Sequence, residues 1–181
     1  MRRKDLDKSL IREYVTEALL QLLEKKDYDE ISVREIAERA GVHRATFYRH
    51  FRSKEDILRC CFVEILKGAE GDRELLHKDF ASFIQHVFQA LYDKKEQILL
   101  LNRAHLTGLL MDVLKDYFGF EDDAENDSEK SVDLDRSPVS ILIEQYRSAY
   151  RIGGIYSCLL FWFSHDMKET PEEMARIAAA M

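Results

Sequence analysis

The chain has 181 residues, of which 46% are hydrophobic and 34% charged, and its formal net charge is −7. This length and composition predict a globular protein with a substantial core. The longest apolar run, CLLFWF at 158–163, is far shorter than the ~18 residues of a membrane span. We therefore expect a cytoplasmic protein that does not enter a membrane. The three cysteines and six histidines show neither a disulfide framework nor metal-ligand spacing, so no metal or cofactor is predicted.

Charge is distributed unevenly along the chain. Residues 1–68 carry 15 Lys or Arg against 13 Asp or Glu, a net charge of +2, whereas residues 69–181 carry −9. Residues 39–54 contain five Lys or Arg and no acidic residue. Because local charge decides what binds at a surface, this stretch is a candidate contact for a polyanion.

The spacing of apolar residues predicts an all-α fold. Nearly every segment shows the 3.6-residue period, and only two prolines and seven glycines interrupt it. We expect a first amphipathic helix over about 8–26. Ser32 and Glu35 form a capping-box pattern at the start of a second helix, which Gly41 ends.

A short third helix is expected from residue 43 or 44 to about 50, followed by a fourth. Ser53 and Asp56 form the capping pattern of this fourth helix. Its predicted buried face consists of Ile57, Leu58, Cys61 and Ile65. For the cysteines at 60 and 61, packing as small apolar residues is favoured over a redox sensor.

The remaining sequence predicts further helices and one long loop. Phe80, Phe83, Ile84, Val87, Phe88 and Leu91 share one helix face, and residues 98–118 are helical with a break near Thr107 and Gly108. Residues 119–137 are rich in acidic side chains and poor in apolar ones, which predicts a flexible loop.

Two helices are expected at the C-terminal end. Pro138 opens a long one that reaches about Ser164, and Thr170 with Glu173 caps the last. Gly153 and Gly154 lie in the middle of the long helix, where glycine is unfavourable, so we expect either a bend or the close approach of another helix.

Residues 31–50, ISVREIAERAGVHRATFYRH, have the pattern of a helix-turn-helix motif. Phe47 and Phe51 are predicted to face the core, which leaves donors and flat rings on the outer face of the third helix. Arg side chains read guanine edges, and Thr or Tyr hydroxyls bind phosphate oxygens. The predicted DNA contacts are Ser32, Arg34, His43, Arg44, Thr46, Tyr48, Arg49, His50 and Lys54. For His50, a packed ring bonded to the next helix is an equal alternative.

The stretch SVREIAERAGVHRATFYRHFRSKEDIL resembles the DNA-binding domain of the TetR family of bacterial transcriptional regulators. The resemblance implies that the helix at 43–49 enters the major groove and that residues matching Ser32, Thr46, Tyr48, His50 and Lys54 touch phosphates. His43 stands where that family usually has Ser. The domains implied are a three-helix DNA-binding domain at 6–66 and a helical regulatory and dimerisation domain at 67–181.

The stretch YRIGGIYSCLLFWFSHDMKETPEEMARIAAAM is similar to a subgroup of this family found in Gram-positive bacteria. In the family the last two long helices pair with those of a second subunit, and the helices between enclose a small-molecule pocket. The expected dimer contacts are Gly153, Gly154, Met174, Ile177 and Met181. The expected pocket residues, for which core packing is the alternative, are Phe62, Phe83, Phe88, Tyr92, Tyr117, Tyr146, Tyr150 and Trp162.

These patterns favour a ligand-responsive homodimeric repressor that binds a near-palindromic operator in double-stranded DNA. A regulator whose C-terminal helices bind a partner protein in place of a small molecule is the alternative. No nucleophile with a base, paired carboxylates or phosphate loop is readable, so an enzyme is not expected.

Overall fold

The computed structural model describes residues 3–67, 80–118 and 138–180. Within these ranges the chain forms α-helices and one 3₁₀ turn, with no strand, which confirms the predicted all-α fold. The elements are α1 (Arg3–Leu23), η1 (Tyr28–Glu30), α2 (Val33–Arg39), α3 (Arg44–His50), α4 (Lys54–Leu66), α6 (Phe80–Tyr92), α7 (Lys95–Arg103), α8 (Gly108–Phe118), α9 (Pro138–Ser164) and α10 (Pro171–Ala179).

The first four helices pack around one apolar centre. Helix α1 contacts α2, α3 and α4 and buries Val15, Ala18 and Leu19 between them. Phe47 on α3 and Phe51 just after it are buried against this centre, as predicted. The long apolar face of α1 therefore fixes the positions of the three shorter helices.

Gly41 sets the turn between α2 and α3. Its φ of 67° lies in the left-handed region, which glycine adopts without a steric penalty. The amide of Val42 donates to the carbonyl oxygen of Ala37 at 3.0 Å, which closes the end of α2. Helix α3 then begins at Arg44, with His43 as its N-cap.

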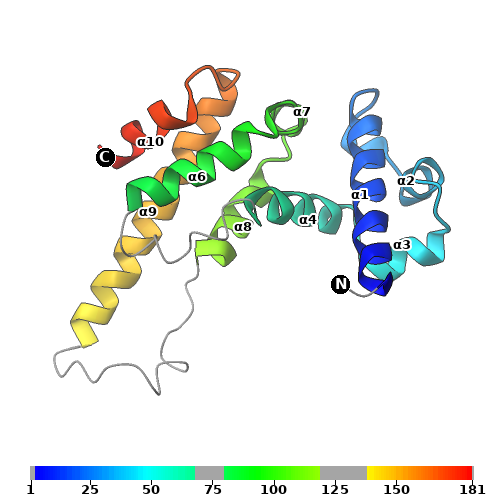
Figure 1. Cartoon of the computed structure of the whole chain (residues 1–181), viewed down its shortest axis with the longest axis horizontal. Coiled ribbons are helices and arrows are strands. Elements are labelled where there is room, and N and C mark those ends of the chain that lie inside the picture. The colour runs from blue at the N-terminus through cyan, green and yellow to red at the C-terminus, as the bar shows by residue number, and fades with distance from the viewer. Residues whose placement is uncertain (1–2, 68–79, 119–137, 181) are drawn as a thin grey trace.

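The C-terminal helices form a second packed group. Helix α6 lies against α10, while α9 packs on α7 and α8 (Figure 1). The face predicted for α6 is buried at Phe83, Ile84, Val87, Phe88 and Leu91, whereas the side chain of Phe80 lies outside the described set. The predicted break in the next helix is present between Arg103 and Gly108.

The turn between α9 and α10 is fixed by side chains from two places. The indole Nε1 of Trp162 donates to the carbonyl oxygen of Glu169 at 3.1 Å, and the Lys95 ammonium donates to that of Met167 at 2.8 Å. Thr170 and Glu173 then form the predicted capping box of α10.

Helix α4 joins the two groups. It packs on α1 at one side and on α6 and α8 at the other, and Figure 1 shows it spanning the space between them. Arg59 on α4 also forms an ion pair with Asp116 on α8. Helix α4 is therefore the element through which the N-terminal and C-terminal helices contact each other most extensively.

Candidate nucleic-acid interface

Helix α3 has one buried side and one exposed side. Phe47 is fully buried and its ring meets that of Tyr48 edge-on, with ring centroids 5.3 Å apart. The outer side carries His43, Arg44, Tyr48 and Arg49, all exposed, with Thr46 half-buried beside them. These five of the six contacts predicted on α3 and its N-cap thus lie where the core does not cover them.

Arg44 and Tyr48 contact each other along α3. The guanidinium Nη2 donates to the Tyr48 hydroxyl at 3.3 Å, and the guanidinium carbon lies 5.4 Å from the centre of the ring. These residues are four apart, so they are neighbours on one helix face. The contact limits the rotamers of Arg44 and leaves most of its donors free for a ligand.

His50 lies half-buried in the last turn of α3. Burial, followed by the positive charges of Arg49, Arg12 and Lys8, lowers the pKa of His50 below its ordinary value. The ring is therefore neutral at pH 7 and has one donor and one acceptor. Arg12 and Lys8 belong to α1, a helix that the sequence prediction of DNA contacts left out.

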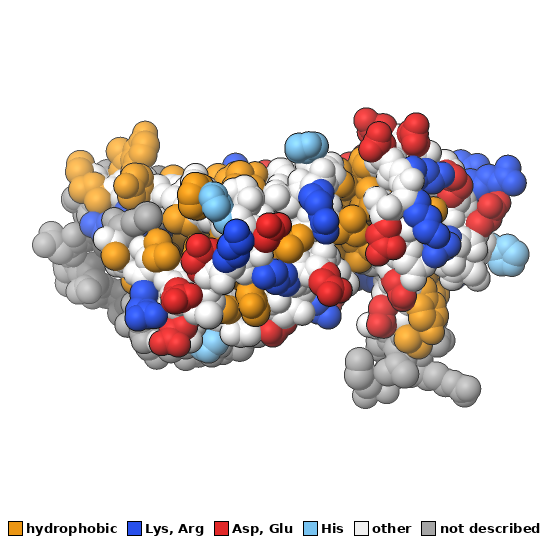
Figure 2. Space-filling view, turned by 90° about the horizontal axis from the view of Figure 1, so that it is seen from above, with side chains coloured by type: hydrophobic (Ala, Val, Ile, Leu, Met, Phe, Trp, Pro, Cys, Tyr) orange, Lys and Arg blue, Asp and Glu red, His pale blue; other side chains and the backbone are white. Residues whose placement is uncertain are grey.

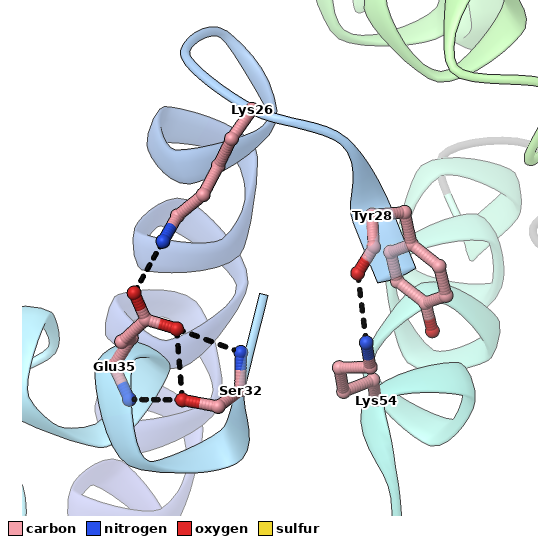
Figure 3. Close-up of polar contacts among 5 residues, drawn as sticks. All are labelled: Lys26, Tyr28, Ser32, Glu35 and Lys54. Carbon is pink, nitrogen blue, oxygen red and sulfur yellow. Dashed lines mark hydrogen bonds and ion pairs between the residues drawn. The ribbon is translucent and has the colours of Figure 1, made fainter. Parts of the chain in front are cut away.

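Ser32 and Glu35 form the predicted capping box at the start of α2 (Figure 3). The Ser32 hydroxyl donates to Glu35 Oε2 at 2.8 Å, and the Ser32 amide donates to the same oxygen at 2.9 Å. Lys26 also pairs with Glu35. The ammonium of Lys26, and then the Ser32 hydrogen bonds, lower the pKa of Glu35 to about 2. The carboxylate is thus held ionised beside the predicted phosphate contact at Ser32.

Lys54 has an internal partner that its sequence position did not predict. Its ammonium donates to the carbonyl oxygen of Tyr28 at 2.7 Å and lies 4.3 Å from the centre of the Tyr28 ring (Figure 3). The Tyr28 hydroxyl in turn donates to Glu55 at 3.2 Å. Lys54 therefore anchors the loop before α2 to the start of α4, and two of its three donors remain for a phosphate.

The ion pairs described in this structure leave α3 out. Carboxylates neutralise Lys26, Arg34, Arg59 and Lys67, and the pair made by Arg34 is with Glu38, four residues on. Within the described residues, neither Arg44 nor Arg49 on α3 forms an ion pair with a carboxylate. The positive charge of this helix is thus not cancelled locally, which is the electrostatic footprint of a nucleic-acid contact.

The predicted pocket residues separate into two groups. Phe62, Phe83, Phe88 and Trp162 are buried, and the Trp162 ring meets Phe88 edge-on at 5.4 Å and stacks on Tyr92 at 6.0 Å. The rings of Phe88, Tyr92 and Trp162 therefore pack on one another.

Tyr146 and Tyr150 correct the pocket prediction, because they are 71% and 78% exposed on α9. They do not line a cavity inside the chain. The long helix has two apolar faces, and helical spacing alone did not tell which of them is inward. The side chain of Tyr117 lies outside the described set.

The predicted dimer residues also need one correction. Met174 is only 5% exposed and belongs to the core of its own chain, where α10 packs on α6. Ile177 is 41% exposed, and no heavy atom lies within 4 Å of a Cβ placed on Gly153 or Gly154. The close helix expected at the two glycines is therefore not supplied by the described part of this chain. Met181 lies outside the described residues, as does the predicted acidic loop.

Cys60 and Cys61 are thiols held in their protonated form. Burial raises the pKa of Cys60, and it raises that of Cys61 to about 11. A thiolate is the reactive form, so this environment favours the packing role.

The described residues hold no cluster of His, Cys, Asp or Glu suited to a metal ion. Among the described helices, none has both the length and the apolar character to cross a bilayer.

Comparison with known proteins assigns the chain to a family. Residues 15–61 match the model described as bacterial regulatory proteins, tetR family, and residues 78–181 match a transcriptional regulator C-terminal region. The chain belongs to the TetR family of DNA-binding, helix-turn-helix transcriptional regulators. This confirms the family predicted from the sequence and the prediction that the chain is a transcriptional regulator.

Relatives with curated names are also helix-turn-helix regulators. The HTH-type transcriptional regulator YvkB of Bacillus subtilis is 36% identical over 72 residues, which are 35% of this chain and 38% of that protein. YxbF of the same organism is 24% identical over 179 residues, which are 90% of this chain and 42% of that protein. The chain thus spans less than half the length of these curated relatives.

Solved structures share the fold. A TetR transcriptional regulator from Streptococcus agalactiae 2603V superposes with a TM-score of 0.60 at 20% identity, covering 98% of this chain and 96% of its own. The fatty acid degradation regulator FadR from Bacillus halodurans gives a TM-score of 0.53 at 15% identity, covering 94% and 93%. At these identities the likeness concerns the fold alone.

Proposed function

We propose that the chain is a ligand-responsive repressor that binds a near-palindromic operator as a homodimer. The observation that carries the DNA-binding part is the two-sided α3. Phe47 anchors its back in the core, while Arg44, Tyr48 and Arg49 stand exposed and outside the described ion pairs. An exposed helix of this chemistry, presented by a rigid unit, suits the major groove.

Within this proposal the predicted contacts divide into two kinds. Arg44, in the first turn of α3, reads a base edge, because the early residues of a recognition helix reach the base pairs. Tyr48 and Lys54 bind phosphates and fix the register of the helix on the duplex. The remaining proposed contacts are Ser32, Arg34, His43, Thr46, Arg49 and His50.

The exposed side of α9 supports a homodimer. Six large apolar residues of this helix are at least half exposed, at spacings that put them on one face opposite the buried Ile152 and Leu159: Val139, Leu142, Ile143, Tyr146, Tyr150 and Phe161. Figure 2 shows apolar side chains gathered at the end of the molecule away from the DNA-binding helices. An apolar surface of this extent is typical of an interface. In a two-fold dimer the same face of a second copy would lie against it, so that the apolar faces of both copies would be covered.

The ligand response would act through α4. A ligand bound among the C-terminal helices shifts α4, and with it the separation of the two α3 helices, which must match grooves about 34 Å apart. The ligand has to bind the two states with affinities that differ by roughly 1–3 kcal/mol to give a typical response. The contacts of α4 with α1, α6 and α8 support this route.

One observation favours the alternative, in which a partner protein binds the C-terminal helices. Phe88, Tyr92 and Trp162 fill the space between their helices with one another, while the apolar face of α9 is open to solvent. This alternative is tested by sedimentation of the DNA-bound chain in the presence of a candidate partner protein. A complex that contains the chain and the partner in equal amounts would support the alternative over a small molecule.

The test is binding of the purified chain to genomic DNA fragments, followed by measurement of affinity on the fragment it selects. Arg44→Ala should lose about 1–3 kcal/mol of discrimination between the selected and scrambled duplexes. Arg176→Ala on α10, an exposed residue far from α3, is the matched control and should keep the wild-type preference. A wild-type chain that ignores DNA of every sequence at low salt contradicts the proposal.

A further inference from the structure

Cations from two helices meet at the C-terminal end of α3. Arg49 and His50 come from the last turn of α3, and the charges of Arg12 and Lys8 on α1 act on the His50 ring. Helix α1 packs on α3, and Figure 1 shows the N-terminal end of α1 beside it. Among the residues whose side chains are described, the charged groups that shift the pKa of His50 are all positive.

The place of Lys8 and Arg12 on α1 follows from helical geometry. They are one turn apart and lie in line with Val15 and Leu19, on the N-terminal continuation of the buried stripe. Both side chains are exposed. They therefore stand at the seam between α1 and α3, with their charged ends in solvent.

Lys8 and Arg12 are not paired with carboxylates in the described part of the chain, since none of its ion pairs includes them. The carboxylates of α1 whose side chains the structure describes project elsewhere. Glu13 and Glu17 are five and nine residues after Lys8, which puts them roughly 140° and 180° around the helix. The seam thus carries positive charge next to a helix whose outer side is also positive.

We propose that Lys8 and Arg12 belong to the DNA interface and bind the phosphates beside the groove that α3 enters. This inference rests on the proposed function, because it extends the same interface to a second helix. The two residues sit beside α3 and not on its outer side, so they meet the sugar-phosphate backbone and not the base edges. They add affinity for every duplex and leave the sequence preference to α3.

The experiment measures DNA affinity of the full chain as a function of salt for Lys8→Ala/Arg12→Ala. Each phosphate contact contributes about 0.9 to the slope of log affinity against log salt, so the slope should fall by about 2 for each bound protomer. Affinity for the selected and scrambled duplexes should fall by the same factor. Lys8→Arg/Arg12→Lys should restore most of the affinity, because it keeps both charges.

The matched control is Lys25→Ala/Arg176→Ala. It removes one Lys and one Arg that are exposed and lie away from α3. The inference is supported if the control keeps the wild-type slope of log affinity against log salt while the slope of Lys8→Ala/Arg12→Ala is reduced. Equal slopes for the two double variants overturn it, since they would reflect net charge alone. Thermal unfolding monitored by circular dichroism checks that both variants are folded.

The outcomes separate this inference from the proposed function. If Lys8→Ala/Arg12→Ala binds like the wild type while Arg44→Ala loses its preference, the inference fails and the proposed function stands. If the wild type shows no affinity for any duplex, the proposed function itself fails.

Discussion

Arg59 on α4 forms an ion pair with Asp116 on α8, residues that are 57 positions apart in the sequence. The pair links the helix that carries the DNA-binding unit to the C-terminal helices. The two side chains are 44% and 63% exposed, so solvent screens the attraction. Apolar contacts of α4, such as those of the buried Phe62 and Leu66, therefore supply most of the free energy that holds the two groups together.

A double-mutant cycle on this ion pair should give a small coupling free energy. Arg59→Ala, Asp116→Ala and the double variant are expected to yield a coupling below about 1 kcal/mol, which falls further as salt is added. Chemical denaturation at low and high salt measures it. A coupling above about 2 kcal/mol would show that the pair is a main link between the helices.

Acid should destabilise the N-terminal helices through Glu35. Its pKa is lowered to about 2 in the folded chain, chiefly by Lys26, from an ordinary value of 4.5. The stabilisation is therefore complete above pH 4.5 and is lost as the pH falls from 4.5 towards 2. Glu35→Gln should reduce this part of the pH dependence of the melting temperature, measured by circular dichroism.

Glu173 provides the control for that measurement. Its pKa is also lowered, by the backbone and side-chain hydrogen bonds of Thr170, but it caps α10 at the other end of the molecule. Glu173→Gln should therefore leave the acid response of the N-terminal helices as it is. An unchanged acid response in Glu35→Gln would contradict the role assigned to the capping box and Lys26.

The two sides of α3 should respond differently to truncation. Phe47→Ala removes a fully buried ring and should lower the free energy of unfolding by about 3–5 kcal/mol. Tyr48→Ala, at a residue that is 48% exposed, should cost about 1 kcal/mol or less while weakening DNA binding. Denaturant unfolding and DNA titration of the two variants test this, and equal losses of stability would show that the assigned faces are wrong.

The two glycines of α9 offer a test of the proposed dimer. Because nothing lies within 4 Å of a Cβ at Gly153 or Gly154, alanine should stabilise the single chain by roughly 0.5–1 kcal/mol at each site. If a second copy packs there, the same substitutions should weaken association. Sedimentation and thermal unfolding over a range of protein concentrations measure both effects.

Gly108→Ala is the matched control for the α9 glycines. It too has an open Cβ position, but it begins α8. This variant should leave the association constant unchanged. Unchanged association in Gly153→Ala/Gly154→Ala as well would exclude the two glycines from the interface.

Local patterns in the sequence predicted much of the fold. The capping boxes at Ser32 and Thr170 depend on residues three positions apart, and the structure has both. At Ser53 the hydroxyl accepts from the Asp56 amide as expected, but the Asp56 carboxylate accepts from the amide of Arg52. Patterns of this kind are predictable because the interacting atoms belong to a single turn of the chain.

Features that depend on tertiary packing were not predictable in the same way. The contact of Lys54 with Tyr28 joins residues 26 positions apart, and the exposure of Tyr146 depends on which face of α9 the other helices cover. One feature of the sequence did point to Lys8 and Arg12, since they are cations one turn apart in line with the apolar stripe of α1. Their neighbour His50 is distant in sequence, so only the packing of α1 on α3 brings them to the candidate site.

The left-handed backbone at Gly41 sets a constraint that is torsional and not steric. No heavy atom lies within 4 Å of a Cβ placed there, so a larger side chain would find room, yet it would have to adopt a φ of 67°. Asn and Asp tolerate this region better than β-branched residues do. In a library that samples all amino acids at this position, survivors should therefore be ranked by their backbone preference and hardly at all by their size.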